Sequence, residues 1–402
     1  MKASLLDVVR EQAIRSSNFR LLSSRCLGAW PVSVLECLER LALESGPVQK
    51  AAIRLADDAQ EGFAEELSPV EGLPAEHPLD GDWRFAPGVP ETILRRLRDV
   101  AGNSGRILLA CVPTLVLAAA RLRMSHQIVV AVRNGDPVSE ALRGLVPGSL
   151  YLDFDELGGL GASAGVIDPP WYNDVAAPLA QRVCAGIREG GILLVCGPDL
   201  LTAASSARAP IGNVTDLYPG LAPVGRTSRV RYRTPLFESR ALQAAGIRNV
   251  PAFWRTGLLR PFVRSGTSDP AMLPLAPDSG WVEVPSQSAS RLWLRASMAE
   301  GKKARIVVTD SVSRTSPLRV TASAWTSSNT VMIGGTVDEI RKIALGQAGS
   351  ASGLVGKIEE SDAKPCWRRR VSQRMKLAPS EHGWDNSDGP RESGGPAVLS
   401  EI

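Results

Sequence analysis

The chain contains 402 residues, of which 44% are hydrophobic and 22% are charged. These proportions are typical of a soluble globular protein, and the length suits one large domain or two to three ordinary ones. The net charge of +4 is mild, so it allows contact with nucleic acid without arguing for it. No apolar run approaches the roughly 20 residues that cross a bilayer, and the charged N-terminus is unlike a signal peptide. We therefore expect a cytoplasmic protein without a membrane partner.

The six cysteines and three histidines are scattered along the chain, and no two cysteines form a CxxC pair. Zinc sites need such residues at short, regular spacings. We therefore predict that the protein binds no metal and that its thiols are reduced, as is usual in the cytosol.

Residues 1–70 are predicted to form a helical extension. Apolar residues recur at helical spacing in the segments 5–13, 34–43 and 51–67, the second of which follows Pro31. A loop rich in proline, glycine and acidic residues follows at 68–90 and marks a domain boundary.

From residue 80 to residue 265 the pattern changes to alternating strands and helices. Strands are predicted at 106–110, 127–132, 150–154, 165–167 and 191–196, and helices at 92–100, 114–123, 175–188 and 236–245. Continuous apolar strands that alternate with helices indicate a parallel sheet covered on both faces. The predicted fold class is therefore α/β, and residues 250–264 are expected to close the sheet as a hairpin that turns at Thr256-Gly257.

The last part of the chain divides in two by composition. Residues 275–348 are predicted to form a β-rich C-terminal addition with a final helix near 337–345. Residues 349–402 are rich in glycine, serine, proline and charge, so we expect a disordered tail.

The fourth predicted strand ends in an unusual motif, Asp168-Pro169-Pro170-Trp171-Tyr172. Neither proline donates a backbone N–H, and each fixes its own φ near −65° and extends the residue before it. The turn is therefore stiff, and its carbonyls are free to accept hydrogen bonds from an amino group beside the Asp168 carboxylate. Ligands of parallel sheets bind at the carboxyl ends of strands, which is where the motif lies. The structural alternative is a tight turn that ring packing stabilises.

This segment resembles the catalytic (Asp/Asn)-Pro-Pro-(Tyr/Phe/Trp) motif of class I S-adenosylmethionine-dependent methyltransferases that act on amino groups. The resemblance covers residues 80–265 and implies a Rossmann-like methyltransferase core. It implies that Asp168 and the Pro169 carbonyl bind the amino hydrogens, that Pro170 stiffens the turn, and that Trp171 stacks on the acceptor. Tyr172 would line the pocket or donate a hydrogen bond.

The loop after the first strand departs from the usual glycine-rich pattern, since it reads ACVPTL from Ala110. It is nevertheless similar to a segment of the N6-adenine-specific methyltransferase-like branch, which includes a lysine methyltransferase of an elongation factor. The resemblance implies that Cys111, Pro113 and Thr114 hold the methionine part of S-adenosylmethionine at a helix N-terminus, with Thr114 capping that helix.

Two further segments are assigned to the cofactor by the same resemblance. Asp153 would accept the N6 amino group of the cofactor adenine, with Phe154 against the ring. Asp136 is the candidate for the ribose, although it follows its strand later than usual. Taken singly, each acid is better explained as a solvated loop residue. Taken together with Asp168 in this order, the acids support the cofactor assignment more strongly than each does alone.

Three acceptors or roles remain open at this point. The first is N6 of adenine in DNA or RNA, because the large face of Trp171 suits stacking on a base. The second is a lysine or glutamine of a protein, because related motifs serve both. The third, from another class, is a catalytically degenerate interaction module, which the missing glycine loop favours. The sequence does not indicate the oligomeric state.

Arg229, Arg231 and Arg233 alternate along a predicted strand. Alternation would place them on one face, where they could bind the phosphates of a nucleic acid in a salt-dependent way. The alternative is an exposed cationic strand without a ligand.

Overall fold

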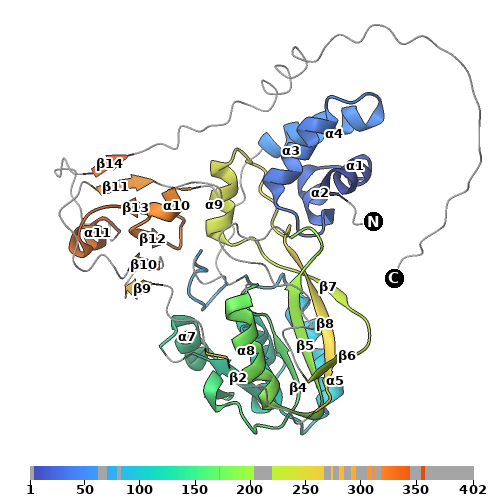
Figure 1. Ribbon diagram of the computed structural model, residues 1–402, viewed down its shortest axis with the longest axis vertical. Helices are drawn as coiled ribbons and strands as arrows, with labels where there is room; N and C mark the ends of the chain where they lie inside the picture. Colours follow the sequence, from blue (N-terminus) through green and yellow to red (C-terminus); the bar gives the residue numbers. More distant parts are fainter. Residues whose placement is uncertain are drawn as a thin grey trace, which may run out of the picture.

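The computed structural model describes residues 4–61, 70–78, 83–133, 135–171, 173–202, 220–266, 273–274, 280–284, 291–295, 306–309, 311–312, 318–344 and 355–357. A helical part, a central α/β sheet and a second, smaller sheet follow one another along the chain (Figure 1). None of the helices in these ranges has the length and hydrophobicity to cross a membrane. The same ranges contain no group of three His, Cys, Asp or Glu side chains suited to a metal.

The central sheet confirms the predicted Rossmann-like α/β fold. Its strands are β1 (Ile107–Ala110), β2 (Ile128–Val132), β3 (Leu150–Asp153), β4 (Ala162–Ile167), β5 (Ile187–Pro198), β6 (Leu221–Pro223), β7 (Ser228–Arg231) and β8 (Thr256–Arg264). They lie in the order β3-β2-β1-β4-β5-β8-β6, and β7 also pairs with β8. The first five are parallel, whereas β8 runs antiparallel to β5, β6 and β7.

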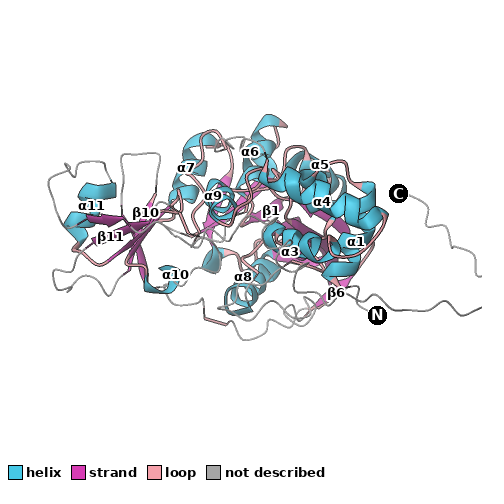
Figure 2. Cartoon of the chain, turned by 90° about the horizontal axis from the view of Figure 1, so that it is seen from above, coloured by secondary structure: helices cyan, strands magenta, loops and turns pink. Residues whose placement is uncertain are grey.

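Helices cover both faces of this sheet. They are α5 (Val89–Ala101), α6 (Pro113–Arg121), α7 (Pro137–Leu145) and α8 (Asn173–Gly186), with short 3₁₀ turns at η1 (Ser125–Gln127) and η2 (Phe154–Glu156). Helix α9 (Leu236–Ala244) lies outside this layer, beside the N-terminal helices (Figure 1). Viewed from above, α5 and α6 lie on one side of the central strands and α8 on the other (Figure 2). Helix α7 was not among the predicted helices.

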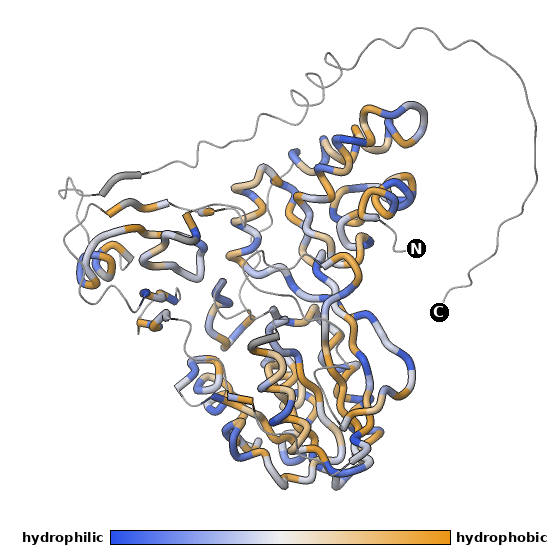
Figure 3. The backbone as a smooth tube through the Cα atoms, in the orientation of Figure 1, coloured by the Kyte–Doolittle hydropathy of each residue, from blue (hydrophilic) through white to orange (hydrophobic). Residues whose placement is uncertain are grey.

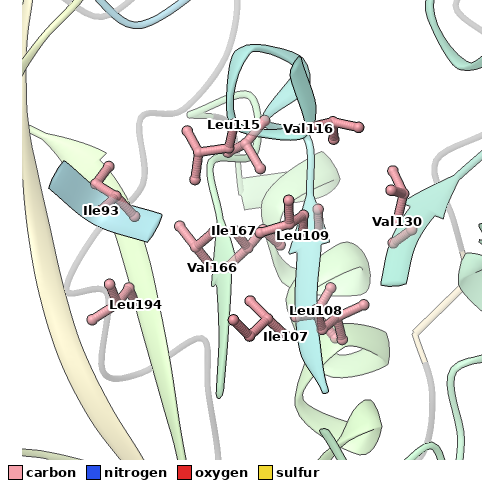
Figure 4. Close-up of a cluster of buried hydrophobic side chains, with 14 of the residues drawn as sticks. Ile93, Ile107, Leu108, Leu109, Leu115, Val116, Val130, Val166, Ile167 and Leu194 are labelled. Carbon is pink, nitrogen blue, oxygen red and sulfur yellow. The ribbon is translucent and has the colours of Figure 1, made fainter. Parts of the chain in front are cut away.

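The core lies between these layers. Every residue of β1 and β2 is buried, as expected for strands that are covered on both faces. Leu109 of β1 and Val166 of β4 pack among apolar side chains of the neighbouring strands and helices (Figure 4). The central strands are accordingly apolar along most of their length (Figure 3).

The segment 250–264 is not a hairpin, so that prediction was wrong. Thr256 and Gly257 begin the single nine-residue strand β8 instead of forming a turn. The strand continues through these residues because it has partners on both edges, with β5 on one and with β7 and then β6 on the other. A local pattern cannot reveal partners that lie up to about 70 residues away.

The N-terminal part consists of helices, as expected. They are α1 (Leu5–Arg15), α2 (Phe19–Arg25), α3 (Pro31–Leu41) and α4 (Pro47–Gln60). Ser4 and Asn18 cap the first two, and prolines begin the other two. Their apolar faces share one core with Leu242, Ile247 and Trp254, which belong to α9 and the segment before β8. The helices are therefore packed onto the central part of the chain.

The second sheet has the order β14-β11-β13-β12-β10-β9. Its strands are β9 (Trp281–Val284), β10 (Leu292–Arg295), β11 (Ile306–Thr309), β12 (Ala324–Thr326), β13 (Val331–Ile333) and β14 (Val355–Lys357), accompanied by α10 (Leu318–Thr321) and α11 (Val337–Ala344). Strand β14 lies in the segment expected to be disordered, so that expectation was wrong for these three residues, which add to the edge of β11. Residues 358–402 lie outside the described ranges.

The stretch that comprises residues 70–78 and 83–86, here called the linking segment, contacts all three parts. His77 Nε2 lies 3.0 Å from the Trp325 carbonyl oxygen, and its ring stacks on Trp293. The buried Arg84 and Glu76 lie 3.5 Å apart within the segment itself. These contacts, together with a hydrogen bond of 3.2 Å from Arg240 to the Ser328 carbonyl oxygen, attach the second sheet to the rest of the protein.

Candidate active site

The motif at Asp168 lies where the strand order of the sheet reverses. Strand β4 ends at Ile167, and the Asp168 backbone N–H donates to the carbonyl of Ala110, the last residue of β1, at 3.2 Å. From β1 the chain moves outward to β2, whereas from β4 it moves the other way to β5. In open parallel sheets this switch point, at the carboxyl ends of the strands, is the usual place for a ligand.

The Asp168 carboxylate has two buried neighbours, Tyr232 and Cys196. Burial first, and then the charge of Asp168, raise the pKa of the Tyr232 hydroxyl and of the Cys196 thiol well above their usual values. Both groups are therefore neutral at physiological pH. The half-buried Asp168 thus lies beside two neutral groups at the end of the sheet.

Trp171 packs against other protein groups. Its side chain is 8% exposed, its ring meets Tyr232 edge to face at 5.7 Å, and the guanidinium carbon of Arg255 lies 4.3 Å from the ring centroid. The same carbon lies 4.3 Å from the ring centroid of Trp83, so Arg255 contacts both indoles. Whether Trp171 also stacks on an acceptor stays a prediction. Tyr172 lies outside the described residues.

The start of β8 fits closely beneath these rings. A Cβ atom on Gly257 would come within 3.0 Å of the Gly197 carbonyl oxygen and of ring atoms of Trp171 and Tyr232. Only glycine allows β8 to pass so close to both rings. This close packing holds the Trp171 ring in place on the side that faces β8.

The loop after β1 takes a conformation that normally favours glycine. Cys111 has φ +57°, in the left-handed region. Pro113 then takes the first position of α6, so the cap residue is Val112, which makes no side-chain cap. The expectation that Thr114 caps the helix was therefore wrong. Its hydroxyl is buried and has no hydrogen-bond partner in the described part of the chain.

The acidic candidates for the cofactor each cap a helix. Asp153 accepts from the backbone N–H of Asp155 at 3.1 Å at the start of η2. Asp136 accepts from the backbone N–H and hydroxyl of Ser139 at the start of α7. Phe154 is 6% exposed and belongs to the core of the sheet. The structure places Asp153 at the end of β3 and Asp136 after β2, and their cofactor roles stay predictions.

The three arginines of β7 and its extension lie on one face, and Val230 and Tyr232 are buried on the other. Tyr232 is the neighbour of Asp168, so the arginine face is turned away from the motif. Arg229 donates to the Asp199 carboxylate, which is buried and also accepts from Thr256 at 2.8 Å. Phosphate binding by these arginines stays a prediction.

Three residues at this site were not foreseen in the sequence: Tyr232, Arg255 and Trp83. They come from the residue after β7, from the residue before β8 and from the linking segment, and only the fold brings them together. One signal was present for Tyr232. In the run RVRYR the arginines mark one face of a strand, so the intervening residues belong to the buried face.

No family model matches the sequence, and no curated protein matches it. The branched-chain polyamine synthase of Thermus thermophilus, in complex with N4-aminopropylspermidine and 5'-methylthioadenosine, is similar at 16% identity over 67% of this chain and 90% of that one, with a TM-score of 0.44. A methyltransferase of Burkholderia thailandensis that acts on N1 of 1,6-didemethyltoxoflavin is similar at 13% identity over 44% of this chain and 77% of that one, with a TM-score of 0.27. A protein of Bacillus halodurans described as an unconfirmed methyltransferase has 10% identity over 44% of this chain and 100% of that one, with a TM-score of 0.32. Likenesses at this level indicate neither the activity nor the substrate of this chain.

Proposed function

We propose that the chain is an S-adenosylmethionine-dependent methyltransferase that acts on an amino nitrogen, with N6 of adenine in DNA or RNA as the first candidate acceptor. The observation that carries the proposal is the position of Asp168-Pro169-Pro170 at the switch point of the sheet. There an acceptor-rich turn without backbone donors lies at the place where parallel sheets bind ligands.

The residues near the end of β1 fit the cofactor in part. The N-terminus of α6 presents backbone N–H groups next to the unpartnered Thr114 hydroxyl, a combination suited to a carboxylate. The left-handed Cys111 turns the backbone as a glycine would. Asp153 uses one carboxylate oxygen for its cap and could offer the other to an amino group. When bound, S-adenosylmethionine supplies a methyl group on a positively charged sulfur.

The contribution of the chain is to place the acceptor. Asp168 and the Pro169 carbonyl would accept the two amino hydrogens and hold the nitrogen lone pair toward the methyl group. Such positioning contributes several kcal/mol, up to about 11 in the best cases. No strong base is required, because the proton leaves after the nitrogen has attacked.

A second acceptor, a lysine or glutamine of a protein, is favoured by the surroundings of Trp171. This ring is 8% exposed and contacts Arg255 and Tyr232, which reduces the area available for a stacked base. In support of nucleic acid, Arg231 is exposed on the β7 face and could contact phosphates. A degenerate interaction module is the alternative of another class.

The test is calorimetric titration of the purified chain with S-adenosylmethionine and S-adenosylhomocysteine, followed by radiolabelled methyl transfer to DNA, RNA and protein fractions. Micromolar binding and label in one fraction would support the proposal and identify the acceptor class. If neither compound binds, the methyltransferase proposal fails and the interaction module becomes the better description.

A further inference from the structure

Tyr232 is held at the site more firmly than an ordinary core tyrosine. Its ring stacks on Phe85 at 5.0 Å and meets Trp171 edge to face, and residues 85 and 232 form an antiparallel bridge. Gly257 leaves no room for a Cβ against its ring. The ring is therefore fixed on three sides by elements from different parts of the chain, and its side chain is 1% exposed.

The Tyr232 hydroxyl is an anomaly in this packing. It is fully buried, yet no group in the described residues lies within hydrogen-bonding geometry of it. A buried hydroxyl without a partner costs about 1–3 kcal/mol, so such groups are rare and need an explanation. Burial first, and then the charge of the Asp168 carboxylate and its side-chain interaction with the hydroxyl, raise the pKa of Tyr232. The hydroxyl is thus a direct neighbour of the Asp168 carboxylate.

We infer that Tyr232 is a positioning residue of the proposed methyltransferase site, and that its hydroxyl donates to the Asp168 carboxylate when an amino group is bound. This inference rests on the proposed function. A carboxylate has acceptor capacity for several donors, so one oxygen can take the tyrosine hydrogen while the other takes a hydrogen of the substrate. The tyrosine would then fix the direction in which Asp168 holds the amino nitrogen.

The contact can be measured before the acceptor is known. Sinefungin resembles S-adenosylmethionine but carries an amine-bearing carbon in place of the methyl-bearing sulfur, so its amine probes the position beside Asp168. S-adenosylhomocysteine lacks any group there. The ratio of their dissociation constants, obtained by calorimetry, reports the amine contact separately from the rest of the cofactor site.

For the wild-type chain we expect sinefungin to bind about tenfold more tightly than S-adenosylhomocysteine, as for a hydrogen bond to a charged group. Asp168→Asn should remove this preference. Tyr232→Phe should reduce it about threefold or more while S-adenosylhomocysteine affinity stays within about twofold, which also shows that the variant is folded. Phe85→Leu, which weakens the packing of the same ring but keeps the hydroxyl, should lower stability and leave the preference intact.

Each other outcome is informative. An unchanged preference in Tyr232→Phe would overturn the inference while the methyltransferase proposal stands. Equal affinities of both compounds for the wild-type chain would also overturn it, since the amine would then not reach Asp168. If the wild-type chain binds neither compound, it is the proposed function that fails.

Discussion

At the scale of single residues, Asp168 combines a role in the chain with a role in the proposed chemistry. Its backbone N–H is bonded to the end of β1, and this bond does not depend on the side chain. We therefore expect Asp168→Ala to leave S-adenosylhomocysteine affinity within about threefold, while methyl transfer falls by at least 100-fold, because the amino group loses its charged acceptor. Calorimetry and a labelled transfer assay measure the two quantities.

The control for this variant is Asp7→Ala, which removes an exposed carboxylate that pairs with Arg10 on the N-terminal helix α1. It should keep both transfer and binding. Loss of transfer and cofactor binding together in Asp168→Ala would mean that the side chain is structural.

Cys111 offers a test of backbone strain. A non-glycine residue at φ +57° costs about 1–2 kcal/mol, and a β-branched side chain costs more there. We expect Cys111→Val to lower the free energy of unfolding by about 1–2 kcal/mol. Cys111→Gly should stay within about 1 kcal/mol of the wild type, because relief of strain offsets the greater entropy of glycine in the unfolded chain. Urea unfolding measures both, and equal losses in the two variants would contradict the strained conformation.

The sequence could point to Asp168 because its motif is local, since five consecutive residues define the turn. It could not point to Arg255, whose partners Trp83 and Trp171 lie 172 and 84 positions before it in the chain. The capping role of Thr114 was misassigned because a proline next to it took the first helical position.

At the scale of elements, the close packing of β8 against Trp171 and Tyr232 predicts that adding one methyl group at Gly257 lowers stability. Gly257→Ala places a Cβ 3.0 Å from a backbone oxygen and two ring atoms, so we expect a loss of about 1–3 kcal/mol in stability. Gly266→Ala is the matched control, because a Cβ there has nothing within 4 Å. Thermal and urea unfolding compare the two variants. Similar stabilities would show that the site at Gly257 can accommodate a Cβ without displacing its neighbours.

The strands of the central sheet were predictable because they are buried on both faces and read as continuous apolar runs, such as Ile128–Val132. The role of residues 256–264 was not, since Thr256-Gly257 within the run suggested a turn. These residues belong to a strand because β8 has partners on both edges.

At the scale of the whole molecule, the attachment of the second sheet predicts a dependence on pH. Burial lowers the pKa of His77 from 6.5 to about 3. Below pH 6.5 the His77 side chain is protonated in the unfolded chain but stays neutral in the folded chain. The free energy of unfolding therefore decreases as the pH falls toward 3. From pH 7 to pH 5 this loss amounts to about 2 kcal/mol.

In the His77→Gln variant the free energy of unfolding should decrease by about 2 kcal/mol less from pH 7 to pH 5, because glutamine does not titrate. Urea unfolding of both chains at pH 7, 6 and 5 isolates it, since the other titrating groups contribute equally to both. Parallel pH dependences in the two chains would show that His77 is not buried as a neutral ring.

The linking segment also bears on how this chain could change in evolution or engineering. Loops between domains usually accept extra residues, because few contacts cross them. Here His77 and Trp83 each face a different part of the molecule, six positions apart. An inserted residue between Trp83 and Phe85 would shift the contact of Trp83 with Trp254 out of register with the bridge between Phe85 and Tyr232. New sequence should therefore be accepted more readily at Gly102 or Gly220, where a side chain meets nothing within 4 Å, than in the stretch that separates the predicted domains.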